Sequence, residues 1–345
     1  MGLKPGDIVL DPMMGSGTVL IEACLMGINS MGIDSSPFCR FMTQTKIDAL
    51  TMSLDRVRNA LSNHEEVYEY FQKKVGRPET GSKAKGTKLS LNLGKVMEHE
   101  AEYSKKNYKM QSYDDKVFFE TYNLLLLAYL DSAGYSERSG RKSPVNQFKA
   151  ILERYLFVTE KIQRVLSELK IKPARVKAIE ADARSLPIDD SSIDGVLFSP
   201  PYSFAIDYLS NDSFHLNFLG VDIVNLRERM IGLRGRKLSD KVTLYFEDMS
   251  KVLSECSRVL RPGKICTIVV GTNNNQLGKV FGISPSEVCG IHEMLIDIGA
   301  THGLDLIKMF SRPITGMVLS TFLCKFLIGQ FSEEWQVVMH FSYRV

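Results

Sequence analysis

The stretch 7-DIVLDPMMGSGTVLIEACLMGINSMGID-34 decides the fold. Its apolar run at 8–10 predicts a short buried strand, and the glycines that follow predict a tight loop. The apolar-periodic segment 18–27 predicts a helix that ends at Gly27, and residues 30–34 predict a second strand ending on an acid. The order strand, glycine loop, helix, strand and acid is typical of the first half of a nucleotide-binding α/β sheet.

The same alternation returns in the second half of the chain. Apolar runs predict strands just before Asp182, at 193–202 and at 265–271, with helices over 246–260 and 285–299 between and after them. Two late strands are expected at 317–328 and 335–341, and helices at 36–70, 114–132 and 146–170. The connection from Asp34 to the strand near 176 is too long for an ordinary crossover. We therefore expect an α/β domain from residues 1–45 and 170–345, interrupted by a mainly helical insertion at 46–169.

Composition excludes several classes of protein. The 345 residues are 44% hydrophobic and 24% charged, which is typical of a soluble globular protein, and the net charge of +3 does not by itself indicate a polyanionic partner. The six cysteines form no CxxC pair, so neither a metal site nor a redox motif is expected. No secretory signal and no apolar run of about 18 residues is visible. We expect a cytoplasmic protein with no membrane partner.

Three acids at strand ends and a glycine loop mark a candidate ligand site. Gly15 and Gly17 would let the backbone approach a ligand closely, although a purely structural turn explains a lone GxG about as well. The fingerprint lacks its third glycine, which disfavours NAD, and no GxxxxGK[ST] is present. Asp11, Asp34 and Asp182 could grip a cationic group, a ribose and an adenine amine, or could merely cap turns. A nucleoside ligand with positive charge and no phosphates fits this set, and S-adenosylmethionine meets that description.

The second informative stretch is 196-VLFSPPYSFAIDY-208. Neither Pro200 nor Pro201 can donate a hydrogen bond to a central strand, so the strand is expected to end abruptly there. Ser199 and Tyr202 would then be held rigidly at its tip. A buried structural corner is the alternative interpretation.

The motifs DPMMGSGT, GID and SPPY, in that order, resemble those of the amino-directed DNA methyltransferases. The resemblance covers roughly 1–45 and 170–345 and implies a Rossmann-like, S-adenosylmethionine-dependent methyltransferase that modifies an exocyclic amine. The Ser-Pro-Pro-Tyr form favours cytosine N4 over adenine N6. The motifs imply a catalytic set of Ser199, Pro200, Pro201 and Tyr202. They imply a cofactor-binding set of Asp11, Pro12, Gly15, Gly17, Thr18, Asp34, Asp182 and Ala183.

The resemblance also implies how this site would act. Hydrogen bonds from the amine to the Ser199 hydroxyl and the Pro200 carbonyl would turn the nitrogen lone pair toward the methyl donor. Tyr202 would stack on a target base that has left the duplex. No covalent enzyme intermediate is needed.

A basic stretch, 227-RERMIGLRGRK-237, suits contacts to phosphates, although a solvated surface loop is the simpler interpretation. The nucleic-acid-binding candidates are Arg227, Arg229, Arg234, Arg236 and Lys237. We nominate the insertion at 46–169 as the target-recognition region of a DNA-binding protein, acting alone or in restriction–modification.

Two rival functions stay open. Similar Pro-Pro-Tyr signatures occur in RNA guanine (tRNA N2 type) methyltransferases, so RNA is the alternative partner. The family usually carries an element upstream of the glycine-loop strand, whereas this sequence starts almost on that strand. A second polypeptide could supply that element, and the chain would then be one subunit, even a non-catalytic one, of a split methyltransferase.

Overall fold

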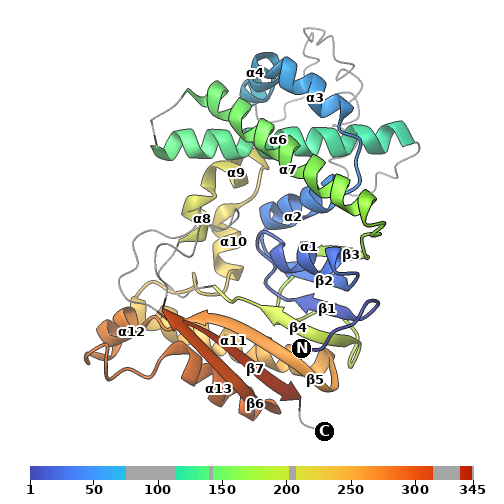
Figure 1. Ribbon diagram of the computed structural model, residues 1–345. Helices are drawn as coiled ribbons and strands as arrows, with labels where there is room; N and C mark the ends of the chain where they lie inside the picture. The colour runs from blue at the N-terminus through green and yellow to red at the C-terminus, as the bar shows by residue number, and fades with distance from the viewer. Residues whose placement is uncertain (75–112, 140–142, 202–206, 314–334, 344–345) are drawn as a thin grey trace. The chain divides into compact units, whose positions relative to one another are not determined.

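The computed structural model divides the chain into two compact units, which we describe separately (Figure 1). The sheet unit comprises Met1–Arg40, Pro173–Asn211 and Asp222–Val345, and the helical unit comprises Phe41–Lys172 and Asp212–Val221. Residues 212–221, which lie within the α/β part expected from the sequence, thus cluster with the helical unit. The structure describes residues 1–74, 113–139, 143–201, 207–313 and 335–343.

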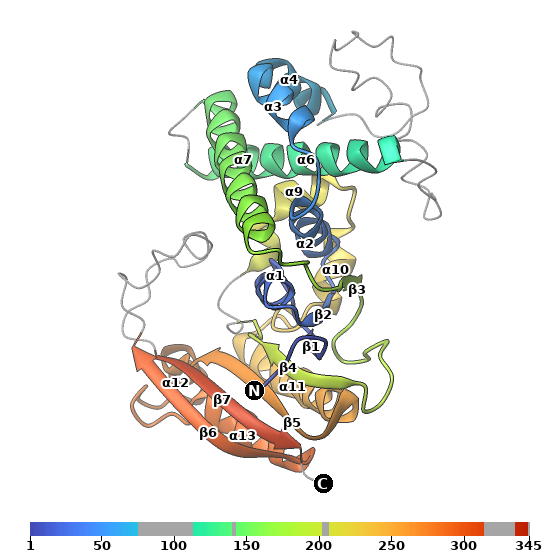
Figure 2. The ribbon, with the colours of Figure 1, turned by 45° about the vertical axis from the view of Figure 1, so that its right-hand side comes forward.

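The sheet unit is built on a seven-stranded sheet with the order β3-β2-β1-β4-β5-β7-β6. The first five strands in sequence pair in parallel, whereas β7 is antiparallel to both β5 and β6. Both views show β5, β7 and β6 side by side at one end of the sheet (Figures 1 and 2). The strand bounds are β1 Ile8–Asp11, β2 Asn29–Asp34, β3 Val176–Glu180, β4 Ile193–Phe198, β5 Leu260–Gly271, β6 Leu304–Pro313 and β7 Trp335–Tyr343.

Alternation along β1 divides the core between the two faces of the sheet. Val9 packs in a cluster with Ala23 of α1 (Thr18–Leu25), whereas its neighbour Leu10 joins the larger cluster. That larger cluster contains the apolar faces of α11 (Leu238–Val259) and α13 (Ile291–Thr301). Successive side chains of a strand point to opposite faces, so both faces of the central strands are covered by helices. The unit also contains α8 Tyr208–Asn211, α10 Ile223–Arg229 and α12 Asn274–Phe281.

The structure agrees with most of the strands and helices expected from the sequence and adds one strand. β6 was not predicted, because its alternation is broken by Asp305 and Lys308 and an edge strand needs no continuous apolar run. The strand expected at 317–328 lies outside the described residues. The helix expected over 246–260 begins earlier, since α11 starts at Leu238.

The helical unit is organised around two long helices, α6 (Tyr113–Ser139) and α7 (Pro144–Glu168). Tyr129 of α6 stacks on Phe71, with ring centroids 5.3 Å apart, and also contacts Tyr68. Aromatic pairs of this kind add to the area that they bury. The shorter helices are α3 Asp55–Ser62, α4 His64–Lys74 and α9 Ser213–Phe218, while α2 Pro37–Ala49 begins within the sheet unit and continues into this one.

A buried histidine ties α9 into this helical core. The Nε2 atom of His215 lies 3.1 Å from the carbonyl oxygen of Leu130. Gly134 makes room for the ring, because a Cβ at that position would lie 2.9 Å from His215 Nε2. Within the described ranges, no helix is long and apolar enough to cross a membrane.

Candidate functional site

The glycine loop between β1 and α1 is shaped by two left-handed residues. Gly15 has a φ of 47° and Gly17 a φ of 76°, a region that side chains with a Cβ rarely adopt. Gly17 is the N-cap of α1, and its amide donates to the carbonyl of Met14 at 2.7 Å. Thr18 opens the helix at an exposed position, while Pro12 is buried at the start of the loop. The loop therefore brings main-chain amides to the carboxyl end of β1.

Asp34 at the end of β2 holds this loop. Its Oδ2 accepts a hydrogen bond from the amide of Gly15 at 3.0 Å, and its Oδ1 accepts one from the amide of Ser36 at 2.8 Å. Each carboxylate oxygen has more than one acceptor position, so these bonds do not exhaust the carboxylate. The structure thus brings Asp34 and the glycine loop together at one edge of the sheet.

Asp11 is a buried acid at the end of β1. Its side chain is 4% exposed, and its Oδ1 accepts a hydrogen bond from the amide of Met13 at 3.0 Å. Burial above all, with a smaller contribution from the nearby charge of Asp34, raises the pKa of Asp11 to about 8, although the hydrogen bond from the Met13 amide opposes the shift. Asp11 therefore keeps its proton at neutral pH in this structure.

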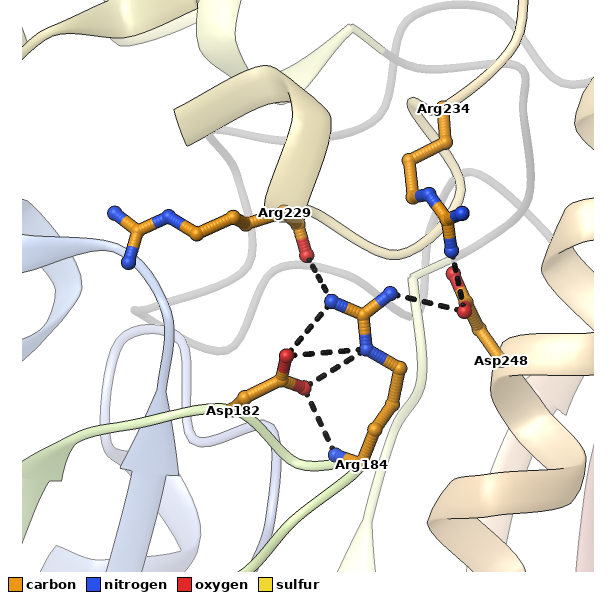
Figure 3. A network of polar contacts seen from close by, with 5 residues as sticks. All are labelled: Asp182, Arg184, Arg229, Arg234 and Asp248. Carbon is orange, nitrogen blue, oxygen red and sulfur yellow. Dashed lines mark hydrogen bonds and ion pairs between the residues drawn. The ribbon is translucent and has the colours of Figure 1, made fainter. Parts of the chain in front are cut away.

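Asp182 follows β3 and is engaged by its neighbour Arg184 (Figure 3). The Nε of Arg184 donates to Oδ1 of Asp182 at 2.9 Å, and its Nη2 donates to Oδ2 at 2.7 Å. Burial alone would raise the pKa of Asp182, but these bonds and the charge of Arg184 hold it below its usual value. Ala183, between them, is buried in the larger core cluster. The carboxylate expected to face an adenine amine is thus already bound by a guanidinium.

Ser199 lies directly after β4. Its hydroxyl donates a hydrogen bond to the carbonyl oxygen of Val269 in β5, at 2.9 Å. Pro200 is buried. The hydroxyl of Tyr245 lies 3.4 Å from the carbonyl oxygen of Pro201, so the hydrogen bond that it donates there is long and weak. Tyr202 lies outside the described residues.

These groups share one edge of the sheet. The strands β3, β2, β1 and β4 are neighbours in that order and run parallel, so their carboxyl ends meet at the same edge. Asp182, Asp34, Asp11 and Ser199 stand at or just after those four ends. In open α/β sheets, ligands bind outside the carboxyl ends of the strands. This edge is the candidate site.

The basic stretch 227–237 contains two kinds of cation. Arg227 donates to Asp207 at 2.7 Å, and Arg234 donates to Asp248 of α11 at 2.7 Å. Arg229, Arg236 and Lys237 form no ion pair with any residue in the described part of the chain. Figure 3 shows the Arg229 side chain pointing away from the arginine–carboxylate network. Two of the five cations therefore already have a carboxylate partner.

The sequence motifs do not include Arg184 or Asp248. Asp248 is completely buried, and it lies on the face of α11 that also carries Tyr245, Met249 and Val252. An acid on the apolar face of an amphipathic helix is the signal that could have found it, because a buried carboxylate requires a partner. No comparable signal marks Arg184, since its partner Asp248 is distant in sequence.

Comparison with known proteins finds similarity to methyltransferases. Residues 1–111 match the family described as the RMKL-like methyltransferase domain. The Type II methyltransferase M.BsoBI of Geobacillus stearothermophilus is 26% identical over 267 residues, which are 66% of this chain and 50% of that protein. The Type II methyltransferase M.MjaII of Methanocaldococcus jannaschii is 24% identical over 90% of this chain and 72% of that protein. The chain thus spans about half the length of M.BsoBI.

A solved structure of an S-adenosylmethionine-dependent methyltransferase from Methanosarcina mazei aligns over 99% of this chain and 95% of its own, at 12% identity and a TM-score of 0.39. The expected fold class, an α/β sheet of the methyltransferase type with substantial helical content, is confirmed by the sheet itself together with the matched methyltransferase domain. Among the described residues, no three His, Cys, Asp or Glu side chains gather as a metal site.

Proposed function

We propose that the chain is an S-adenosylmethionine-dependent DNA methyltransferase that acts on an exocyclic amine, cytosine N4 in preference to adenine N6. The observation that carries the proposal is the hydroxyl of Ser199, which stands at the same strand-end edge of the sheet as Asp11 and Asp34. Two relatives support the reaction class, because both are named as Type II methyltransferases. The preference for cytosine rests on the SPPY motif alone.

The residues at the edge fit the proposed cofactor. The left-handed glycines leave no Cβ in the way of a ligand that approaches the loop, and Asp34, at the end of the next strand, is proposed to bind the ribose. Asp11, together with Pro12, Thr18, Asp182 and Ala183, completes the proposed binding set. The cofactor supplies an electrophilic methyl group when bound. A buried acid, Asp11, suits a cationic ligand, because a positive charge nearby favours its ionised form.

The hydrogen bond of Ser199 prepares it for the proposed role. Because its proton is donated to the carbonyl of Val269, the hydroxyl oxygen can accept an N–H from the target amine. The carbonyl of Pro200 would accept the second N–H, and Pro201 makes this turn stiff because its ring fixes φ. The amine then presents its lone pair in one direction, so catalysis comes from positioning. Tyr202 is proposed to stack on the extruded base.

The DNA backbone has two proposed contact surfaces. The first is the basic stretch 227–237, from the end of α10 through the connection to α11, which we call the basic loop; its Arg229, Arg236 and Lys237 have no ion-pair partners among the described residues. The second is a groove of about 620 Å³ on the helical unit, between α3 and α7. Its acid Glu160 is paired with Arg58 at 2.8 Å, whereas Lys161 in the same groove has no such partner in the described ranges.

Phe157 makes this groove suitable for a nucleic acid. Its side chain is 64% exposed beside Lys161, and it lines the groove. An exposed aromatic ring next to a cation can stack on an unpaired base while the cation contacts the phosphate. We therefore propose that the insertion at 46–169 is the target-recognition region, acting through this groove.

The deciding experiment is methyl transfer from labelled S-adenosylmethionine to separate DNA and RNA pools, followed by digestion to nucleosides and mass spectrometry. N4-methylcytosine in DNA is expected, and N6-methyladenine would keep the reaction class and correct the base. Label only in RNA, for example as N2-methylguanosine, would replace the proposal with the RNA alternative. A chain that binds no cofactor and transfers no label would overturn the proposal, and activity restored by a second polypeptide would make it one subunit of a split enzyme.

A further inference from the structure

One buried carboxylate is shared by two arginines (Figure 3). The Oδ1 atom of Asp248 accepts hydrogen bonds from Nη1 of Arg184 at 2.9 Å and from Nη1 of Arg234 at 2.7 Å. Its Oδ2 atom is equally buried and accepts no hydrogen bond from any residue that the structure describes. A carboxylate offers about four acceptor positions, so Asp248 has capacity for a fuller contact with one guanidinium.

Arg184 connects this carboxylate to the candidate cofactor edge. Besides Asp248, it donates to both oxygens of Asp182 and, from Nη2, to the carbonyl oxygen of Arg229 at 2.9 Å. The amide of Arg184 also donates to Oδ1 of Asp182 at 2.9 Å. Each oxygen of Asp182 thus accepts two hydrogen bonds. An amine that binds to Asp182 therefore has to displace an N–H of the Arg184 side chain.

The displaced guanidinium has a defined place to go. Within the network the charges of Asp182 and Asp248 balance those of Arg184 and Arg234, and an unpaired charge in such a partly buried cluster is costly. If Arg184 leaves Asp182, it can engage both oxygens of Asp248, because Oδ2 has acceptor capacity left. Asp182, whose side chain is 41% exposed, keeps the amide of Arg184 and the nearby charge of Arg229.

Arg234 would then lose its share of the carboxylate. Its side chain is 28% exposed, so its guanidinium can reach solvent without leaving the loop. Arg234 belongs to the basic loop that we propose contacts DNA. A guanidinium released from Asp248 is therefore available for a phosphate, which it binds well because of its planar fork of donors.

We propose that Arg184 and Asp248 are positioning residues that couple the cofactor site to the DNA-binding loop: an amine on Asp182 moves Arg184 onto Asp248 and frees Arg234 for a DNA phosphate. The inference rests on the proposed function. Coupling between two sites is reciprocal, so DNA tightens cofactor binding by the same factor as the cofactor tightens DNA binding.

The test measures DNA affinity rather than methyl transfer. A fluorescent duplex is titrated with the full chain across a series of KCl concentrations, with and without S-adenosylhomocysteine, which carries the adenine amine but no methyl group to transfer. We expect S-adenosylhomocysteine to tighten binding about tenfold at low salt, within the usual range of allosteric coupling. The slope of log K against log salt should steepen by about 0.9, since one more phosphate is contacted.

Two variants should move this slope in opposite ways. Arg234→Gln should keep the shallow slope with and without S-adenosylhomocysteine, because the guanidinium that makes the extra contact is gone. Asp248→Asn should show the steep slope in both conditions, because a neutral amide no longer holds Arg234. A variant that merely weakened the fold would lower the DNA affinity without fixing the slope at the shallow or the steep value.

The matched control is Arg258→Gln. Arg258 lies on the same helix α11 and donates to Glu255 at 2.7 Å, in a network that does not include Asp248. It should keep both the tenfold coupling and the change of slope. The coupling would be overturned if S-adenosylhomocysteine left the DNA affinity of the wild type unchanged, or if Arg234→Gln still showed the change of affinity and slope. Either result would leave the proposed methyl transfer untouched. Absence of any cofactor binding or methyl transfer would overturn the proposed function as well.

Discussion

At the scale of single residues, Asp11 is the most perturbed acid of the candidate site. The folded protein holds its pKa at about 8, whereas an unfolded chain ionises near the ordinary value of 3.8. Between these two values the folded state binds one proton more than the unfolded state. Stability due to this group is therefore fully present below pH 3.8 and is lost as the pH rises toward 8, by roughly 1.4 kcal/mol per pH unit for one proton.

Asp11→Asn should remove this loss of folding stability with rising pH. The amide has nearly the same shape and stays neutral, so the variant should gain stability relative to wild type as the pH rises from 5 to about 8. Urea unfolding at a series of pH values measures the difference. The control is Asp7→Asn, at a partly exposed position directly before the same strand. Parallel curves for wild type and Asp11→Asn would show that Asp11 does not carry a raised pKa.

Ser199 offers a second test at this scale. Ser199→Ala should lower kcat about 100-fold or more, because a positioned hydrogen bond to the reacting group is lost. KM for the cofactor should change little, since Ser199 is proposed to hold the base. Ser192→Ala is the matched control: it lies at the opposite end of β4, and its hydroxyl also donates to a backbone carbonyl, that of Asp189 at 2.7 Å. Equal activity of the two variants would remove Ser199 from the proposed mechanism.

At the scale of elements, the basic loop 227–237 contains cations that are paired with a carboxylate and cations that have no ion-pair partner among the described residues. Arg236→Gln and Lys237→Gln should each lower the slope of log K for DNA against log salt by about 0.9. Arg227→Gln should change the slope less, because the guanidinium of Arg227 is already ion-paired with Asp207. Nitrocellulose filter binding across a salt series measures these slopes. A loss of slope as large in Arg227→Gln as in Arg236→Gln would contradict the division.

The groove of the helical unit makes a prediction for α7. Lys161→Glu should weaken DNA binding about tenfold, because an acid replaces the groove cation that has no ion-pair partner among the described residues. Lys149→Glu is the control, since it changes the same charge on the same helix outside the groove, at a side chain that is 47% exposed. Electrophoretic mobility shifts with one duplex compare the variants. If both weaken binding equally, the effect is one of overall charge and the groove has no special role.

At the scale of the whole molecule, each unit has its own hydrophobic core. Leu127→Ala in α6 and Leu253→Ala in α11 each remove a fully enclosed side chain and should cost about 2–5 kcal/mol. Because chains with separate cores often unfold in more than one step, scanning calorimetry should show two transitions. Leu127→Ala should lower the midpoint temperature of one transition, and Leu253→Ala should lower that of the other. Two variants that shift a single transition alike would show that the units unfold together.

The local pattern predicted those parts of the fold that depend on neighbours in the sequence. The stretch 7–34 specifies strand, loop, helix and strand because its apolar spacing and its glycines act over a few residues. Asp34 could be placed beside the glycine loop for the same reason, since both stand at the ends of adjacent parallel strands. The edge strand β6 escaped prediction because its pairing with β7, and not its own pattern, makes it a strand.

Sequence by itself therefore determined the α/β class, the glycine loop and the strand-end positions of Asp11, Asp34, Asp182 and Ser199. Tertiary structure alone decided what those side chains contact. Ser199 finds the carbonyl of Val269, and Asp182 is joined through Arg184 to Asp248, 64 residues beyond Arg184 in the chain. The physical reason is that hydrogen bonds and ion pairs are fixed by distance in space, and the folding of β3, β5 and α11 onto one another sets that distance.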